Sequence, residues 1–372
     1  MASFDSLATE LISQIFLSCS SVSSVLALAS TCHRFHQIYN SSQKLNILYQ
    51  AAESEFGPLA DLTQLLTHNA SQPAHISRNV PFSTALLSQV VKTGRIAEKW
   101  TTLYPFKKWK YNYEARRVLT EPERYRLRRA LYRLWLYDKA FHTSEYPRET
   151  RVRKPVMQTR ARLLHNWSTE ELAQMADLHS VIREVVQSNV CPSNGAILRR
   201  FRKRTKGMEE SIRPQLFFNI HLNYPLPSTP APFLGSHQLN SEFHNNNGNN
   251  GLSFPKPLSD HFHTTPTYTS RFASSKWYQE PGAEGWGDDI PHYYVVEDML
   301  KLDPGQIMWL KENAMGKAQV EGYVRALGDW FENNGETWGQ TLEWVLEERG
   351  EDVVEFLKGV VWEGGIVGEV EE

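Results

Sequence analysis

Three stretches of the sequence combine a helix start signal with apolar residues at helical spacing. Residues 120–123 (Thr-Glu-Pro-Glu) and 168–171 (Ser-Thr-Glu-Glu) place a capping hydroxyl three positions before a glutamate, and residues 303–306 (Asp-Pro-Gly-Gln) offer the same arrangement with Asp and Gln. Apolar residues then recur every three or four positions, which is the period of an amphipathic helix. Short alternating patterns, typical of strands, occur at residues 215–223 and 293–297. The expected fold class is therefore mainly α.

Composition divides the chain into four zones. We expect an apolar module over residues 5–50, a basic helical body over 51–221, a loop zone rich in Pro and Asn over 222–292, and an acidic helical part over 293–372 that packs on the body. Within the loop zone, residues 236–253 are predicted to be disordered because Asn and Gly favour turns and bury little apolar area. No period of 20 to 50 residues recurs, which argues against a solenoid or a propeller.

The charge is distributed unevenly although its sum is only −2. Residues 92–165 hold 20 Lys and Arg against 7 Asp and Glu, a balance of +13, whereas residues 277–372 hold 6 against 22, a balance of −16. These two regions either attract each other within the molecule or offer a basic and an acidic face to partners of opposite charge.

The three cysteines indicate a reducing compartment. Cys19, Cys32 and Cys191 form an odd set without a CxxC motif, so we expect free thiols and a location in the cytoplasm, the nucleus or both. Residues 11–33 carry no Asp, Glu, Lys or Arg but include seven serines, which do not suit a membrane-spanning helix, and no signal peptide is predicted before them. We therefore expect no membrane association.

Apolar residues near the N-terminus predict two or three short helices. Positions 7, 11, 12, 15 and 16 form one amphipathic stripe, and a second helix is expected after Ser24 as its N-cap. About 40 residues are too few to bury a full core alone, so some apolar surface should remain available to a partner.

The same residues resemble an F-box. Its pattern appears as Leu7-Ala8-Thr9-Glu10-Leu11-Ile12, then Ile15-Phe16, Val25-Leu26-Ala27-Leu28 and Cys32-His33-Arg34-Phe35. The resemblance implies a three-helix module that binds the Skp adaptor of an SCF-type ubiquitin ligase, and through it the cullin and RING subunits. The rest of the chain would then bind an unidentified protein substrate. The implied adaptor-binding residues are Leu7, Ala8, Leu11, Ile12, Ile15, Phe16, Val25, Leu28 and Phe35.

Two departures from the F-box pattern occur, one at the start of the first helix and one in the turn that follows it. Ala8 stands where the family has proline, and the turn over residues 18–23 is about one residue longer than usual, a difference that loop entropy tolerates. We expect Leu11 and Ile15 to be the main anchors, because truncation of a central aliphatic anchor commonly weakens an interface by about 2 kcal/mol. The alternative is an ordinary helical hairpin that packs on the rest of the protein.

Cations and aromatic rings alternate in the body. The runs are Lys107-Lys108-Trp109-Lys110-Tyr111-Asn112-Tyr113 and the helix that contains Arg126, Arg129 and Arg133, which are spaced to share one face. Three interpretations remain open: a face neutralised by the acidic part, a site for phosphorylated or acidic substrate segments, and a nucleic-acid surface. The helix and its continuation to residue 142 also resemble helical bodies of fungal F-box proteins.

A second basic run is a candidate nuclear import signal. It comprises Arg199, Arg200, Arg202, Lys203 and Arg204, because import receptors read short runs of Lys and Arg. A solvated helix end or loop is the alternative.

No signature of catalysis stands out. The sequence contains no GxSxG, HExxH or GxGxxG motif and no glycine-rich phosphate loop. The histidines and cysteines of residues 32–36 and of residues 261–263 lack the paired spacing of a zinc site. We therefore expect a non-catalytic protein without cofactor or metal. The leading hypothesis is a substrate receptor of an SCF ligase, and the alternative is a nucleic-acid-associated or scaffold protein that uses residues 92–165. An uncharacterised enzyme is the third reading, against which only the missing motifs argue.

Overall fold

The computed structural model describes residues 7–193, 195–196, 295–314, 316–362 and 365–367. In these residues the secondary structure is helical and contains no strand, which confirms the expected mainly α class. The first helices are α1 (Thr9–Leu17), α2 (Val22–Ala29), α3 (His33–Tyr39), α4 (Lys44–Phe56), α5 (Leu59–Thr67) and α6 (Thr84–Lys108). They are followed by α7 (Glu121–Phe141), α8 (Lys154–Leu164) and α9 (Thr169–Val185), and later by α16 (Pro304–Asn313), α17 (Lys317–Ala326), α18 (Asp329–Asn333), α19 (Trp338–Arg349) and α20 (Val353–Trp362).

The start signals of α7 and α9 form as the sequence predicts. At α9 the backbone N–H of Glu171 donates to Ser168 Oγ at 3.2 Å, and the N–H of Ser168 donates to the Glu171 carboxylate at 3.0 Å. At α7 the N–H of Thr120 donates to Glu123 Oε2 at 2.7 Å. Each bond satisfies a backbone donor that the first helical turn leaves without an intrahelical acceptor.

The start of α16 is a complete capping box. Asp303 Oδ1 accepts from the N–H of Gln306 at 2.8 Å, while Gln306 Oε1 accepts from the N–H of Asp303 at 3.0 Å. Pro304 occupies the first helical position, where its missing N–H costs no hydrogen bond.

The chain folds into two compact units that are each built from separate stretches. Unit 1 comprises Met1–Ala140, Thr159–His179 and Leu342–Glu372, and unit 2 comprises Phe141–Gln158 and Ser180–Thr341. The four zones expected from composition are each one continuous stretch, whereas both units combine separate stretches of the chain. The acidic C-terminal part is accordingly divided, with residues 342–372 in unit 1.

The core of unit 1 is built around α4 and α6. The two helices pack closely against each other. Gly94 of α6 permits this close packing, since a Cβ atom there would lie 2.3 Å from the Phe56 ring of α4. Leu59 and Leu62 of α5 and Leu127 and Leu131 of α7 are also buried. Apolar stripes of the kind seen in the sequence thus supply the hydrophobic core.

Unit 2 contains a buried polar cluster. Lys301 is only 1 % exposed, and its ammonium group donates to Asp298 Oδ1 at 2.9 Å and to the carbonyl oxygens of Phe331 and Asn334. Arg148 pairs with the same aspartate at 2.5 Å. A buried lysine is tolerated only with such partners, because desolvation of an unpaired charge is costly.

Two local predictions are wrong. Residues 295–297 of the expected strand 293–297 are helical, because Val295, Val296 and Met299 are buried at helical spacing, and a five-residue pattern is too short to separate the two periods. The N-cap of α2 is Ser21, whose Oγ accepts from the N–H of Ser24 at 3.1 Å, so Ser24 lies inside the first turn.

Several expectations lie outside the described residues. They concern the strand candidate at 215–223, the whole loop zone 222–292 with its expected disordered tract at 236–253, and the basic run Arg199, Arg200, Arg202, Lys203 and Arg204. Among the helices that are described, none has the length and apolar character that crossing a membrane requires.

Candidate adaptor-binding surface

The N-terminal helices form a small bundle with its own core. Ile12 and Phe16 of α1, Val25 of α2 and Phe35 of α3 are at most 5 % exposed. The Phe16 and Phe35 rings meet edge to face with centroids 6.1 Å apart, an arrangement that aromatic pairs prefer. These four side chains therefore serve the fold of the module.

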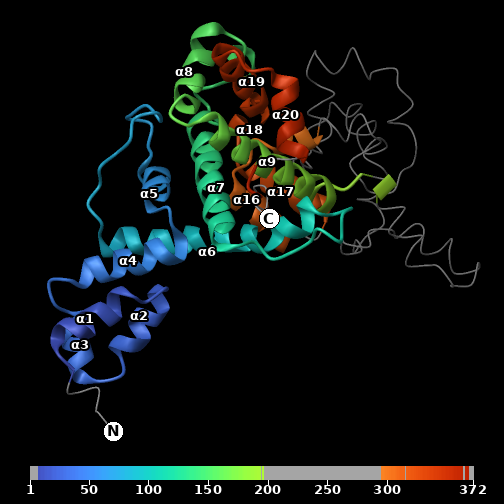
Figure 1. Cartoon of the computed structure of the whole chain (residues 1–372). Coiled ribbons are helices and arrows are strands. Elements are labelled where there is room, and N and C mark those ends of the chain that lie inside the picture. Colours follow the sequence, from blue (N-terminus) through green and yellow to red (C-terminus); the bar gives the residue numbers. More distant parts are fainter. Residues whose placement is uncertain (1–6, 194, 197–294, 315, 363–364, 368–372) are drawn as a thin grey trace, which may run out of the picture. The chain divides into compact units, whose positions relative to one another are not determined.

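Helix α4 closes this bundle. Helices α1 and α2 pack against α4, where Ile47 is fully buried (Figure 1). Glu55 near the end of α4 accepts a hydrogen bond from the N–H of Val22 at 2.8 Å and so caps the start of α2. An acidic group at a helix N-terminus also interacts favourably with the helix dipole.

The other predicted adaptor-binding residues remain accessible. Leu11 is 53 % exposed, Ala8 is exposed, and Leu7, Ile15 and Leu28 are half-buried. Leu11 and Ile15 lie four positions apart on α1 and therefore share one face. The predicted set thus separates into a buried half, which holds the module together, and an accessible half, which is free to contact a partner.

Leu26 was missed as an accessible residue. It is 50 % exposed, although the sequence places it inside the apolar run of α2. The sequence held no signal for this exposure, since Leu26 lies four positions after the buried Val22 and by helical spacing falls next to the stripe of residues 22, 25 and 29.

Ala8 is the N-cap of α1 and adopts a conformation that proline also favours. Its φ is −63° and its ψ is 148°, and its side chain makes no capping hydrogen bond. The preceding carbonyl, that of Leu7, accepts from Arg34 Nη2 at 2.5 Å. Arg34 thereby ties the entry into α1 to α3.

Arg129 and Arg133 of the predicted basic site form ion pairs inside unit 1. Arg133 of α7 pairs with Asp61 at 2.7 Å and with Glu171 at 2.9 Å, and Arg129 pairs with Glu171 at 3.2 Å. Arg128, which was not among the predicted residues, pairs with Glu98 at 2.9 Å. The acidic partners come from α5, α6 and α9 rather than from the C-terminal part of the chain.

These arginines alter the ionisation of Glu171. Burial opposes the charged form, but the Ser168 N–H and the Arg133 guanidinium outweigh it and hold the pKa of the carboxyl below its usual range. The carboxylate therefore stays charged at neutral pH and completes the ion-pair cluster.

The remaining predicted cations differ in their surroundings. Lys108 pairs with the buried carboxylate of Asp177 at 2.7 Å. Lys110 lies over the Tyr111 ring at 5.0 Å from its centroid. Lys107 and Arg126 are half-buried. The structure thus does not bring the six predicted cations together as one anion site.

The cysteines are free thiols, with Cys191 buried and Cys19 and Cys32 half-buried. Burial raises the pKa of the Cys191 thiol, which keeps it protonated and unreactive. Within the described ranges, no group of three or more His, Cys, Asp or Glu side chains could hold a metal ion.

Comparison with known proteins found no matching family model, no matching curated protein and no matching solved structure. The functional assignment therefore depends on the residues and their geometry.

Proposed function

We propose that the chain is a substrate-recognition subunit of an SCF-type ubiquitin ligase. In this role α1–α3 bind the Skp adaptor, and the remaining helices bind a protein substrate in the cytoplasm or the nucleus. The chain would carry out no covalent step itself. It would raise the effective concentration of a substrate lysine near a ubiquitin-conjugating enzyme that the cullin and RING subunits position.

The exposure of Leu11 supports this proposal most directly. The core of the module is already formed by Ile12, Phe16, Val25 and Phe35, so Leu11 is not needed there. Leu11 and the half-buried Ile15 on the same helix face offer apolar surface that a partner could cover. The F-box resemblance implies that the adaptor binds at this helix.

The test is capture of the purified chain by an immobilised Skp adaptor. We expect the wild type to bind and the double variant Leu11→Ala with Ile15→Ala to bind at least about thirty-fold more weakly, because two apolar anchors are removed. The matched control is Val354→Ala with Leu357→Ala on α20, which removes apolar side chains that are 61 % and 40 % exposed.

Circular dichroism and thermal unfolding should establish that both variants fold. Absence of wild-type capture, or equal capture of the two double variants, would contradict the proposed function.

A further inference from the structure

Helix α20 carries a broad stripe of apolar residues, of which the structure buries only one edge. Phe356 and Val360 lie at that edge, where they are half-buried and 5 % exposed, respectively. Val354 and Leu357 lie three positions apart at the other edge and are 61 % and 40 % exposed. The apolar stripe of a surface helix normally faces the core. Val354 and Leu357 therefore form an apolar strip that the described part of the chain leaves uncovered.

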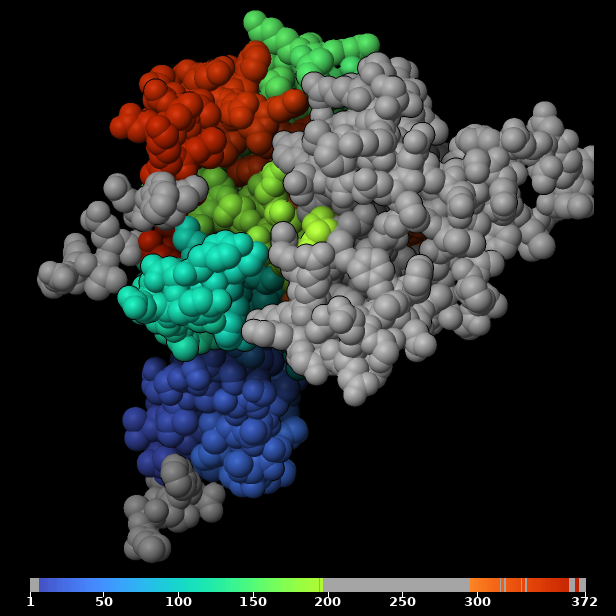
Figure 2. All heavy atoms as spheres, turned by 90° about the vertical axis from the view of Figure 1, so that its right-hand side faces the viewer, coloured from blue at the N-terminus to red at the C-terminus, as the bar shows by residue number. Residues whose placement is uncertain are grey.

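The chain around this strip is strongly acidic. Residues 343–358 contain six Asp and Glu but only two Lys and Arg, a balance of −4. Figure 2 shows the red C-terminal helices, which include α19 and α20, at the molecular surface. Arg349 donates to the carbonyl oxygen of Trp167 at 2.7 Å, and Lys358 is exposed. Neither cation forms an ion pair with a described residue, so the acidic excess stays uncompensated.

Two of the six acids have local partners. Glu348 contacts His165 Nε2 at 2.9 Å, and Asp352 accepts from the backbone N–H groups at the start of α20 at 2.8 and 2.9 Å. The other four are exposed and form no ion pair with the residues that the structure describes; they are Glu343, Glu347, Glu351 and Glu355. We call Glu351, Val354, Glu355 and Leu357 the α20 strip.

The acids of α19 work against the stability of their own helix. Glu347 and Glu348 lie in its last turn, where the helix dipole disfavours negative charge. Glu343 and Glu347 stand four positions apart, a spacing at which like charges repel. Such conflicts between local preference and fold are expected at functional sites.

We propose that the α20 strip binds a basic polypeptide segment whose apolar side chains repeat at helical spacing. Val354 and Leu357 provide the apolar contacts, and Glu351 and Glu355 attract the lysines or arginines of the segment. Nucleic acids and anionic lipid surfaces are disfavoured, because their phosphates would approach a region of the same charge. The identification of the segment as part of the ligase substrate rests on the proposed function, whereas the binding itself does not require the adaptor.

The test is fluorescence anisotropy of the full chain with a labelled peptide of two Leu-Lys-Lys-Leu-Leu-Lys-Lys repeats. We expect the wild type to bind this peptide at least about tenfold more tightly than a peptide with Gln at every Lys position, and more weakly as salt rises. A peptide with Ser at every Leu position should also bind at least about tenfold more weakly, because it lacks the apolar contacts.

Three double variants locate the binding. Val354→Ala with Leu357→Ala should weaken it about tenfold or more. Glu351→Gln with Glu355→Gln should weaken it about fivefold and reduce its salt dependence. The matched control, Glu145→Gln with Glu149→Gln, removes two exposed carboxylates outside α19 and α20 and should change the affinity by less than about twofold.

Thermal unfolding should establish that the three variants fold. Equal binding of the Lys and Gln peptides, no binding, or unchanged binding by the Val354 and Leu357 variant would overturn the proposal. Sedimentation of the chain alone tests the other occupant. Self-association that the Val354 and Leu357 variant abolishes would assign the strip to a second copy of the chain and overturn the proposal as well.

The two proposals fail independently of each other. The Leu11 and Ile15 variant should still bind the basic peptide, and the Val354 and Leu357 variant should still be captured by the adaptor. Loss of adaptor capture in the wild type with retained peptide binding would contradict only the ligase assignment. The reverse result would contradict only the α20 strip.

Discussion

The Asp177 carboxylate of α9 accepts a hydrogen bond from the Tyr104 hydroxyl of α6 at 2.5 Å. The same fully buried carboxylate pairs with Lys108 at 2.7 Å and accepts from the backbone N–H of Ile366 at 3.1 Å. Gly365 has φ +102°, and a Cβ atom there would lie 2.5 Å from Asp177 Oδ2. One carboxylate thus joins α6, α9 and the segment 365–367 of unit 1.

Loss of this carboxylate should destabilise unit 1 strongly. Asp177→Ala removes the acceptor of the Tyr104 hydroxyl and the ion-pair partner of Lys108, so we expect the free energy of unfolding to fall by about 3 kcal/mol. Urea unfolding measures this change. The control Glu347→Ala removes an exposed carboxylate on α19 and should change the free energy by less than about 0.5 kcal/mol. Similar losses in both variants would show that Asp177 has no special role.

Acidification should weaken the ion pairs that Glu171 forms with Arg129 and Arg133. The pKa of Glu171 is lower in the folded state than in the unfolded state, so its stabilising contribution is present above the ordinary Glu pKa of about 4.3 and is lost as the pH falls through the folded value. Glu171→Gln should therefore lower stability at neutral pH and reduce the loss of stability on acidification below about pH 4.5.

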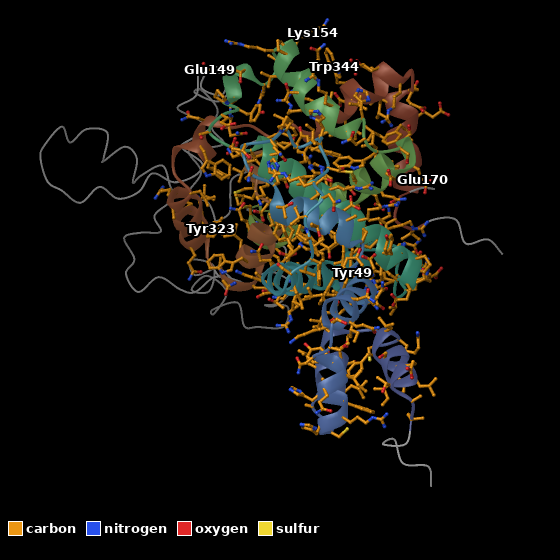
Figure 3. All side chains as sticks on the ribbon, turned by 90° about the vertical axis from the view of Figure 1, so that its left-hand side faces the viewer. Tyr49, Glu149, Lys154, Glu170, Tyr323 and Trp344 are labelled. Atoms are coloured by element: carbon orange, nitrogen blue, oxygen red, sulfur yellow. The ribbon has the colours of Figure 1, made fainter. Side chains whose placement is uncertain are left out.

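Glu170 provides the matched control for this prediction. Glu170 is exposed (Figure 3), and Glu170→Gln should lower the free energy of unfolding at neutral pH by less than Glu171→Gln does. If the free energy of unfolding falls equally with pH in the two variants over the acid range, the prediction for Glu171 is wrong.

Proline at position 8 should stabilise the N-terminal module. The φ of −63° at Ala8 already matches the value that the proline ring imposes. Ala8→Pro should therefore raise the free energy of unfolding by about 0.4 to 1 kcal/mol, because it reduces the conformational entropy of the unfolded chain. Thermal unfolding measures the gain. In contrast, Ala27→Pro inside α2 should cost about 3 kcal/mol, because it removes an intrahelical hydrogen bond. A loss of stability in Ala8→Pro would contradict the prediction.

Two helical glycines should respond oppositely to alanine. Gly94→Ala places a Cβ atom 2.3 Å from the Phe56 ring and should cost about 1 to 3 kcal/mol through overpacking between α4 and α6. Gly322→Ala on α17 meets nothing within 4 Å and should stabilise its helix by about 0.5 to 1 kcal/mol. Chemical unfolding of both variants checks the difference in sign.

Local signals were sufficient for the helix starts but not for every boundary. The capping boxes at residues 168–171 and 303–306 were predicted correctly because they consist of bonds between residues three positions apart. Ser24 was mistaken for an N-cap because four serines precede or begin α2, and the sequence does not tell which of them turns the chain.

The sequence alone did not predict which residues form ion pairs over long distances along the chain. The spacing of Arg129 and Arg133 shows that they share a helix face, yet their partners Glu171 and Asp61 lie about 40 and 70 positions away. Likewise, Leu11 and Ile12 are adjacent apolar residues, but one is 53 % exposed and the other is buried. Helix formation depends on hydrogen bonds within a few residues, which a sequence contains. Burial and ion pairing depend on which helices meet, and that follows from the packing of the whole chain.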